Sequence, residues 1–396
     1  MIVFYNPHVD DFLAEPPHYR FLGRRPLRKY GYLLQGMLES GEDVGILVDG
    51  TVSAFLPERI LVFLPRWLRN AIALVESRWW VRLNGLQGRV HFFNTQNIEP
   101  HNVLFAFSYK GATGLFSERR KLLQKLENVV FHLSHYFVST GEKANNLRGL
   151  DNIWLAGDSD IAENRYFKQY FSWYRRPFLV LPFAVAPRFS IRVDFEDRQA
   201  KCIATGTFHD LKHEVPAEKY ADYMNFFGLS TYHPVRKLIH DNSQRLGAVI
   251  DSKISLYRGA TAGAGLKRYL QHLVVAQKEY FAIDIVELYN GYRYAIVGEE
   301  ASGFPALGAF ECMACGCVLI AQPEYYEGWG LKADEHFVAH DGSLESIIHT
   351  IERLNANVED ARRIAAAGAA FVDEQARLNP AYRWATRTIA GVVGID

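Results

Sequence analysis

Cysteine is scarce in this chain, and neither sign of charge is in excess. Four cysteines among 396 residues are too few for a disulfide framework, which favours a reducing compartment. Lysine plus arginine and aspartate plus glutamate each number 44, so the formal net charge is zero. A neutral chain has no general attraction for polyanions, and we therefore expect no nucleic-acid partner.

Long apolar runs are also missing. The first residues, MIVFYNPHVDDFLAEPP, have neither a basic start nor a long apolar stretch, so we expect no signal peptide. No run reaches the roughly 18 apolar residues of a transmembrane helix. These absences predict a cytoplasmic protein.

One segment has part of the character of a membrane sequence. Residues Arg59 to Leu83, RILVFLPRWLRNAIALVESRWWVRL, mix leucine and valine with three tryptophans and five arginines. The segment is either a core helix with its charges on the outer face, or an interfacial patch that contacts a membrane. The second interpretation would hold the protein at the inner face of the cytoplasmic membrane.

Aromatic residues are abundant, at 14% of the chain, while the charged fraction of 22% is ordinary for a globular protein. Such richness suits large cores and surfaces on which sugar rings stack. A length of 396 residues is too great for one compact core and fits two domains. Short apolar runs such as DVGILVDG alternate with amphipathic runs such as FSERRKLLQKLEN, which predicts parallel sheets covered by helices.

Three of the four cysteines lie in one short stretch, GFPALGAFECMACGCVLIA, from Gly303 to Ala321. We expect a helix that ends at Gly316, followed by a buried strand over 317–321. Cys312 and Cys315 then share a helix face. No second Cys/His cluster completes a recognised set of four ligands, so buried thiols are favoured over a metal or redox site.

The residues before this stretch predict a binding site. AIVGEEASGFP reads as a strand that ends in Glu299 and Glu300, then a glycine turn, then a helix that starts at Pro305. Free N–H groups at the start of a helix bind anions, and open α/β sheets bind ligands at the carboxyl ends of their strands. An acid at such a strand end can also accept bonds from sugar or ribose hydroxyls.

Together these residues resemble a known family. A strand, an acid, a Gly-x-Pro turn, E-x-M-A-C-G and an apolar strand are similar to the donor-binding region of glycosyltransferases with two Rossmann-like domains, the GT-B type. EHFVAHDGSLESIIHTIERLNANVEDARRIAAAGAAFV resembles their final elements, and LVLPFAVAPRF resembles their interdomain linker. The resemblance covers roughly residues 180–390.

The resemblance implies an α/β fold of two Rossmann-like domains, with parallel sheets that face each other across a cleft holding the active site. Residues 1–180 would bind the acceptor, residues 181–380 would bind the nucleotide sugar, and 381–396 would form a helix that returns to the first domain. It implies no cofactor and no metal, because the nucleotide sugar is a substrate.

Two carboxyl groups match the family's pattern to different degrees. Glu311 matches the acid that holds the donor ribose, while Glu299 or Glu300 matches the earlier glutamate only loosely, because the spacing here is wider. In ATGTFHDLK, which we expect to be a loop that includes Thr205 and Gly206, Lys212 can serve as the family's pyrophosphate-binding lysine. Thr207 stands where the family has an arginine.

A histidine and several cations are further candidates for phosphate binding. His233 precedes Pro234, which fits the first residue of a helix, and Arg236 follows in the next turn. The His-Pro pair also resembles the phosphate-binding element of enzymes that use CMP-activated acidic sugars, such as sialic acid or Kdo. Alternatively, His233 caps its own helix. Lys267 is either another phosphate ligand or a solvated charge.

The segment LAGDSDIAEN places Asp158, Asp160 and Glu163 shortly before the linker. One of these carboxylates could act as a general base for an acceptor hydroxyl or as a nucleophile. The alternative is a solvated turn.

The function that these observations predict is a glycosyltransferase of bacterial surface-polysaccharide synthesis, acting on O-antigen (lipopolysaccharide) or capsule. A CMP-Kdo or other CMP-ulosonic-acid donor, related to Kdo transferases, is the alternative to a nucleoside diphosphate sugar. A nucleotide-sugar epimerase and a non-catalytic sugar-binding protein are rivals. The expected partners are a nucleotide sugar, a glycan or lipid-linked glycan acceptor, and peripherally a membrane. The predicted catalytic residues are Asp158, Asp160 and Glu300, and the predicted donor-binding residues are Thr205, Gly206, Thr207, Lys212, His233, Arg236, Lys267, Glu299, Gly303, Phe304, Pro305 and Glu311.

Overall fold

The computed structural model describes residues 1–9, 13, 29–107, 119–133, 140–208, 218–256, 283–301 and 305–393. The chain divides into two compact units. Unit 1 comprises Met1–Ala184 together with Leu378–Asp396, and unit 2 comprises Val185–Arg377. The sequence predicts domain boundaries at residues 180 and 380, whereas the two units divide after residues 184 and 377.

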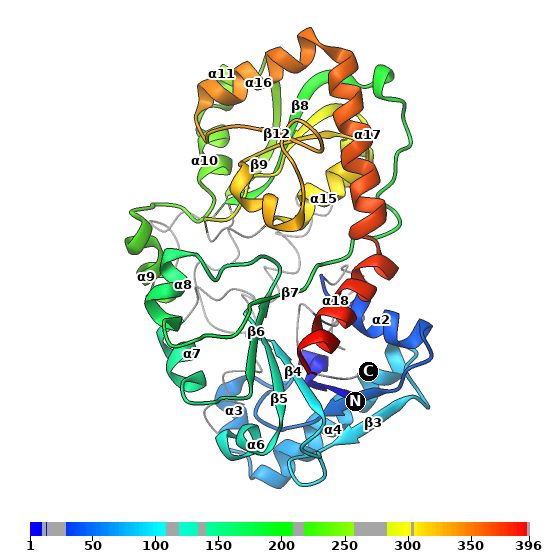
Figure 1. Ribbon diagram of the computed structural model, residues 1–396, viewed down its shortest axis with the longest axis vertical. Coiled ribbons are helices and arrows are strands. Elements are labelled where there is room, and N and C mark those ends of the chain that lie inside the picture. Colours follow the sequence, from blue (N-terminus) through cyan, green and yellow to red (C-terminus); the bar gives the residue numbers. More distant parts are fainter. Residues whose placement is uncertain are drawn as a thin grey trace. The chain divides into compact units, whose positions relative to one another are not determined.

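Unit 1 is built on a parallel sheet (Figure 1). Among its described residues this sheet has seven strands, in the order β3-β2-β1-β4-β5-β6-β7. Each pairing is parallel; Phe4, for example, lies between Ile46 and Phe105. The strands are short, and those inside the sheet, such as β2 and β5, are almost continuously buried, because helices cover a parallel sheet on both faces; the edge strand β3 is only partly buried. They are β1 (Ile2–Tyr5), β2 (Val44–Leu47), β3 (Val90–Phe93), β4 (Val103–Phe107), β5 (Asn128–His132), β6 (Ile153–Gly157) and β7 (Leu179–Val180).

The last helix, α18 (Leu378–Val393), belongs to unit 1 and packs on α2 (Tyr32–Glu39). The ring of Tyr382 lies so close to Gly36 that a Cβ there would meet it at 2.2 Å. The Tyr382 hydroxyl donates to Glu42 over 2.6 Å. The other helices of this unit are η1 (Pro7–Val9), α3 (Glu58–Leu61), α4 (Arg66–Leu83), α6 (Arg120–Lys125), α7 (Thr140–Leu147) and α8 (Arg165–Phe171).

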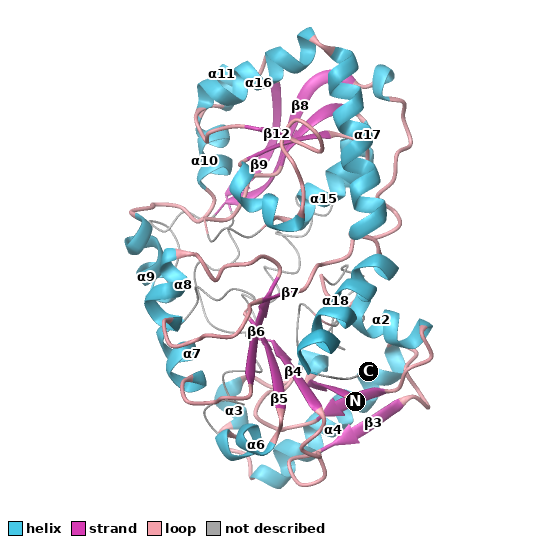
Figure 2. Cartoon of the chain, in the orientation of Figure 1, coloured by secondary structure: helices cyan, strands magenta, loops and turns pink. Residues whose placement is uncertain are grey.

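Unit 2 is built on a second parallel sheet (Figure 2). Among its described residues this sheet has five strands, in the order β12-β11-β10-β8-β9. The strands are β8 (Gln199–Phe208), β9 (Ile250–Leu256), β10 (Tyr292–Ile296), β11 (Val318–Ala321) and β12 (Val338–Ala339). The helices are η2 (Phe195–Asp197), α9 (Glu218–Phe227), α10 (Pro234–Asp241), α11 (Ser243–Leu246), α14 (Ile285–Asn290), α15 (Leu307–Ala314), η4 (Pro323–Tyr325), η5 (Glu327–Trp329), α16 (Leu344–Ala356) and α17 (Val358–Gln375). Two parallel sheets with helices confirm the predicted α/β class.

The cysteine-rich stretch forms α15 and β11, as the sequence predicts. Gly316 ends the helical segment with a φ of +79°, a conformation that favours glycine, and the chain then enters the buried strand. All four cysteines are buried and free, and the Cys317 thiol lies 3.0 Å from the carbonyl of Tyr289. The predicted burial of these thiols is confirmed.

One boundary differs from the prediction. Helix α15 begins at Leu307 and not at Pro305, because Ala306 at the N-cap has an extended backbone (φ −76°, ψ 133°). Among the described residues, no helix combines the length and the apolar character needed to cross a bilayer.

Candidate functional site

The carboxyl edge of the unit 2 sheet has the geometry of a ligand site. From β8 the chain continues to β9 on one side, and β10 lies on the other side of β8. The strand order therefore reverses between β8 and β10. Open α/β sheets bind ligands in the crevice at such a reversal, outside the carboxyl ends of the strands.

Arg236 of α10 holds the two strand ends together. Its Nε donates to the carbonyl of Val297 over 2.6 Å, and its two terminal nitrogens donate to the carbonyls of Thr207 (2.8 Å) and Gly298 (2.9 Å). Each guanidinium nitrogen thus has a main-chain acceptor. Arg236 therefore has a positioning role, and its assignment as a phosphate ligand stays a prediction.

Two glycines make room for this arginine. Gly206 (φ +120°) and Gly298 (φ +66°) both have backbones that favour glycine, and a Cβ on either would lie within 2.9 Å of an Arg236 side-chain atom. Gly206 was predicted to bind the donor. Its conformation is accounted for by the close approach of Arg236.

Thr205 and Thr207 lie within a strand and not in the predicted loop. Strand β8 runs on to Phe208 because it pairs with β9 continuously from Cys202. The Thr205 hydroxyl lies 3.0 Å from the Tyr289 hydroxyl, so it has a buried partner within the fold.

His233 is the N-cap residue of α10, and Pro234 is its first residue, as predicted. However, the imidazole makes no capping hydrogen bond, so the interpretation that His233 caps its own helix is wrong. The ring is buried and packs edge-on against Tyr232, with centroids 5.0 Å apart.

Glu299 and Glu300 follow β10 but occupy different environments. The Glu299 side chain is 2% exposed, and neither of its oxygens has a hydrogen-bond partner among the described residues. Burial raises its pKa to about 7, although Tyr326 and Arg236 lie near enough to oppose the rise. Glu300 is half-buried and accepts a hydrogen bond from Tyr232 over 2.9 Å.

Glu311 lies on the second turn of α15, in the same unit. Its side chain is half-buried, and burial raises its pKa to about 7 against the opposing charge of Arg188. Pro305, two residues before the helix, is buried. Close to neutral pH, Glu299 and Glu311 are thus each divided between the protonated and ionised forms.

Asp158, after β6 in unit 1, is buried and accepts a hydrogen bond from Lys29. Burial raises the pKa of Asp158, but Lys29 and the nearby His132 outweigh this effect and lower it. For His132, burial lowers the pKa to about 3, so this ring is neutral at physiological pH. The solvated-turn interpretation is therefore wrong for Asp158.

The same interpretation is right for the two acids that follow. Asp160 is exposed and accepts the backbone N–H of Ala162 over 2.9 Å. Glu163 is exposed and pairs with Lys168. Neither is brought close to Asp158 by a described contact.

A buried polar network at the carboxyl ends of β1 and β2 was not predicted. The Asp49 carboxylate accepts two bonds from Arg119, at 2.6 and 3.1 Å, and its backbone N–H donates to Asn6. Asn6 has a φ of +40°. In the sequence, Asn-Pro and Asp-Gly at strand ends indicate ordinary turns, so the hydrogen bond between Asn6 and Asp49 could not be predicted from them. Nearby, Glu76 of α4 lies 3.5 Å from His8, and both are buried.

Four predicted residues lie outside the described ranges: Lys212, Lys267, Gly303 and Phe304.

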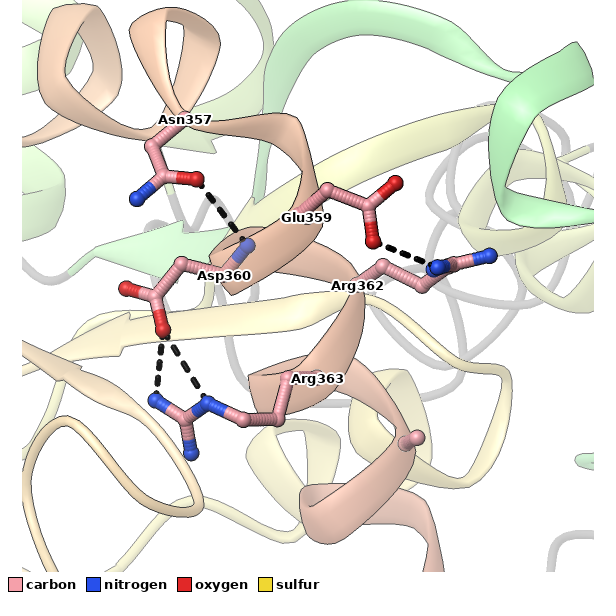
Figure 3. Close-up of a pocket in the computed structure, with 6 residues that line it drawn as sticks. Asn357, Glu359, Asp360, Arg362 and Arg363 are labelled. Carbon is pink, nitrogen blue, oxygen red and sulfur yellow. Dashed lines mark hydrogen bonds and ion pairs between the residues drawn. The ribbon is translucent and has the colours of Figure 1, made fainter.

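A surface hollow at the start of α17 is a less suitable site (Figure 3). The charged side chains along it pair within one helix, Arg362 with Glu359 at 2.5 Å and Arg363 with Asp360 at 2.6 Å. Asn357 caps the same helix through the N–H of Asp360. These contacts neutralise the charges and account for the residues as helix-stabilising ones.

Comparison with known proteins agrees with the fold. Residues 246–388 match the family described as glycosyl transferase-like. Sucrose-phosphate synthase from Thermosynechococcus elongatus superposes with a TM-score of 0.53 over 99% of this chain and 99% of that chain, at 13% identity. Anabaena Alr3699/HepE, solved in complex with UDP-glucose, superposes with a TM-score of 0.50 over 98% of this chain and 99% of its own, at 10% identity. The chain has the GT-B fold. No curated protein sequence matches it.

Proposed function

We propose that this protein is a glycosyltransferase that moves a sugar from a nucleotide-activated donor to a glycan acceptor. The observation that carries the proposal is the buried carboxyl of Glu299, which makes no well-aligned hydrogen bond among the described residues, although the Tyr326 hydroxyl is close, and which lies where the unit 2 strand order reverses. This point lies inside the part of the chain that matches the glycosyl transferase-like family. An unpaired buried carboxyl is costly for folding, so a bound ligand is a physical reason to keep it.

Glu311 is the proposed partner of the donor ribose. A carboxylate accepts two hydroxyl bonds well, and such bonds favour its ionised form. The backbone N–H groups at the start of α15 are the proposed contacts of the donor phosphate, since that helix has no side-chain cap. The same groups would stabilise the negative charge of the departing nucleotide.

In the transfer, the bond between the anomeric carbon and the donor phosphate breaks, and the acceptor oxygen forms the new bond. The acceptor hydroxyl must lose its proton to a base. Of the predicted catalytic residues, we keep Glu300 as the candidate base, because it is half-buried at the carboxyl end of β10 and accepts a hydrogen bond from the neutral hydroxyl of Tyr232. Asp158 is a poorer base, since its ion pair with Lys29 favours the ionised form and lowers its proton affinity.

Two donor classes follow from the site. UDP-glucose is the first to test, because HepE was solved in complex with it. CMP-Kdo or another CMP-ulosonic acid is the second, because Thr207 occupies the position of the family's arginine and the Arg236 nitrogens already bind carbonyls. A monophosphate carries less charge than a diphosphate and needs fewer cations.

The setting we propose is bacterial surface-polysaccharide synthesis, on an O-antigen or capsule intermediate that is carried by a lipid. The abundance of aromatic residues, 14% of the chain, supports a glycan acceptor. Two rival functions predict other results. An epimerase would convert the nucleotide sugar without an acceptor, and a non-catalytic sugar-binding protein would convert neither the donor nor the acceptor.

The first experiment is a melting-temperature screen with UDP, GDP, dTDP and CMP, followed by mass spectrometry of the matching nucleotide sugars with and without glycan acceptors. A ligand at one hundred times its Kd stabilises by about 2.7 kcal/mol, which gives a clear shift. Glu311→Gln should lose most of the shift, and Glu352→Gln, an exposed glutamate in α16, should keep it. The proposal is wrong if no nucleotide binds, or if the donor is converted without any acceptor.

A further inference from the structure

An unusual number of exposed apolar side chains is concentrated in one part of unit 1. Of the ten large apolar residues most exposed in the described part of the chain, six lie between residues 55 and 75. Phe63 is 87% exposed, Trp67 71%, Val75 67% and Val62 63%. Single exposed apolar residues are common, but a group of this size in one segment indicates a contact surface.

Helix α4 has one face in the core and one in solvent. Its buried residues, Ala73, Glu76, Ser77, Trp80 and Val81, repeat at helical spacing. The opposite stripe carries Trp67 in the first turn and Val75 in the middle of the helix, and Arg78 and Arg82, both exposed, in its second half. A solvent-facing stripe is ordinarily polar along its whole length, and here its apolar residues Trp67 and Val75 are exposed.

Hydrogen bonds hold the backbone of the turn before α4, which carries Phe63. Leu61 is buried, and the backbone N–H groups of Phe63 and Leu64 donate to the carbonyls of Ile60 (3.2 Å) and Leu61 (3.0 Å). The most exposed aromatic side chain of the segment therefore stands on an anchored turn. Both α3 and α4 lie in the lower part of unit 1 in Figure 1.

The charges beside these exposed apolar side chains indicate which kind of partner the surface binds. Arg66, Arg78 and Arg82 are exposed, while Glu76, the single acid of α4, is buried and lies 3.5 Å from His8. Apolar side chains beside exposed arginines suit the boundary between acyl chains and anionic headgroups. A second copy of the chain would bring the same arginines into one interface, and α4 has no exposed acid to pair with them.

We propose that the face formed by Val62, Phe63, Trp67, Val75, Arg78 and Arg82, here named the Phe63 face, binds the surface of an anionic phospholipid bilayer. The apolar residues enter the acyl boundary and the arginines contact lipid phosphates. This inference does not rest on the proposed transferase activity. It would bring unit 1 to the surface where a lipid-carried acceptor is found.

The test is sedimentation of the full chain with phosphatidylcholine vesicles that contain phosphatidylglycerol, and with vesicles of phosphatidylcholine alone. We expect binding to the first that weakens at about 0.5 M salt, because salt screens the arginine–phosphate attraction. Phe63→Ser with Trp67→Ser should lower the partition coefficient about tenfold or more, since two large apolar groups lose their burial. Arg78→Gln and Arg82→Gln should each lower it about fivefold.

Ile191→Ser is the matched control, because Ile191 is also exposed, at 53%, but lies in unit 2. It should bind as the unmodified chain does. Brominated phosphatidylcholine should quench part of the tryptophan fluorescence, and Trp67→Phe should remove that part. Circular dichroism and the nucleotide-induced melting shift should stay unchanged in all these surface variants.

Three results would overturn the proposal. The first is that the unmodified chain does not sediment with anionic vesicles. The second is that the variant with Phe63→Ser and Trp67→Ser sediments as strongly as the unmodified chain. The third is that the unmodified chain is a dimer without lipid and these substitutions make it monomeric, in which case a second copy covers the face.

Discussion

Glu299→Gln should make unit 2 more stable at alkaline pH. The Glu299 carboxyl is buried, and burial raises its pKa from the ordinary 4.5 to about 7. Ionised glutamate is therefore costly in the folded state, whereas neutral glutamine has nearly the same shape without the charge. The substitution removes the cost of burying a charge and leaves the packing in place.

The magnitude follows from the two pKa values. Below pH 4.5 the carboxyl is protonated in both states and contributes nothing. Between pH 4.5 and 7 the unfolded chain ionises first, so the folded state holds the extra proton and stability falls as pH rises. A shift from 4.5 to about 7 corresponds to about 3 kcal/mol. The variant should exceed the unmodified protein by about 3 kcal/mol at pH 8 and by about 0.5 kcal/mol at pH 4.5.

The four cysteines provide an assay specific to unit 2, because all are buried and all lie within Val185–Arg377. A brief pulse of dithiodipyridine at each urea concentration labels only chains whose unit 2 is open. Glu300→Gln is the control, since Glu300 is half-buried, bonded to Tyr232, and should show no gain that grows with pH. A Glu299→Gln variant that gains nothing at pH 8, or gains equally at pH 4.5, would refute the reasoning.

Three further predictions follow. If Glu311 binds ribose in its ionised form, nucleotide binding should be about tenfold weaker at pH 6 than at pH 8, because the pKa of Glu311 is about 7. Fluorescence titration of the Glu311→Gln variant should show no such pH dependence. A variant that keeps the pH dependence would show that Glu311 is not in the site. Arg236→Met strands three main-chain carbonyls and should cost about 3 kcal/mol or more in thiol-pulse unfolding; a smaller loss would mean that other donors reach them. Asp158→Asn leaves the Lys29 charge without its partner and should cost about 3–5 kcal/mol at pH 7. Because the pKa of Asp158 is lowered, that cost should shrink as pH falls below about 4, and urea unfolding with a constant difference at all pH values would contradict the ion pair.

The strands could be predicted from the sequence because each is a short apolar run. DVGILVDG contains β2 and GCVLIA contains β11, and a sheet covered on both faces imposes no polar alternation on them. The turn into β11 was also predictable, because Gly316 supplies the positive φ that a helix end requires. These features depend on near neighbours in the chain.

The site was less predictable because it depends on distant partners. ATGTF reads locally as a loop, yet pairing with β9 some fifty residues later keeps Thr205 and Thr207 in a strand. Asp158 reads as a solvated turn, and nothing near it in sequence indicates Lys29, which is 129 residues away. Arg236 likewise reads as a free cation until the strand ends that it joins are known.

The position of α18 in unit 1 has a consequence for synthesis on the ribosome. Unit 2 is a contiguous segment, but unit 1 needs residues from 378 onward, which are translated after unit 2 is complete. Glu42 and Tyr382, which pair through a hydrogen bond, are 340 residues apart. At a translation rate of about 5–20 residues per second, helix α18 is made on the order of half a minute after the surface of α2 around Gly36 that it covers. During that interval the nascent first unit lacks the helix that covers α2, so this surface is open to molecular chaperones until translation passes the end of unit 2.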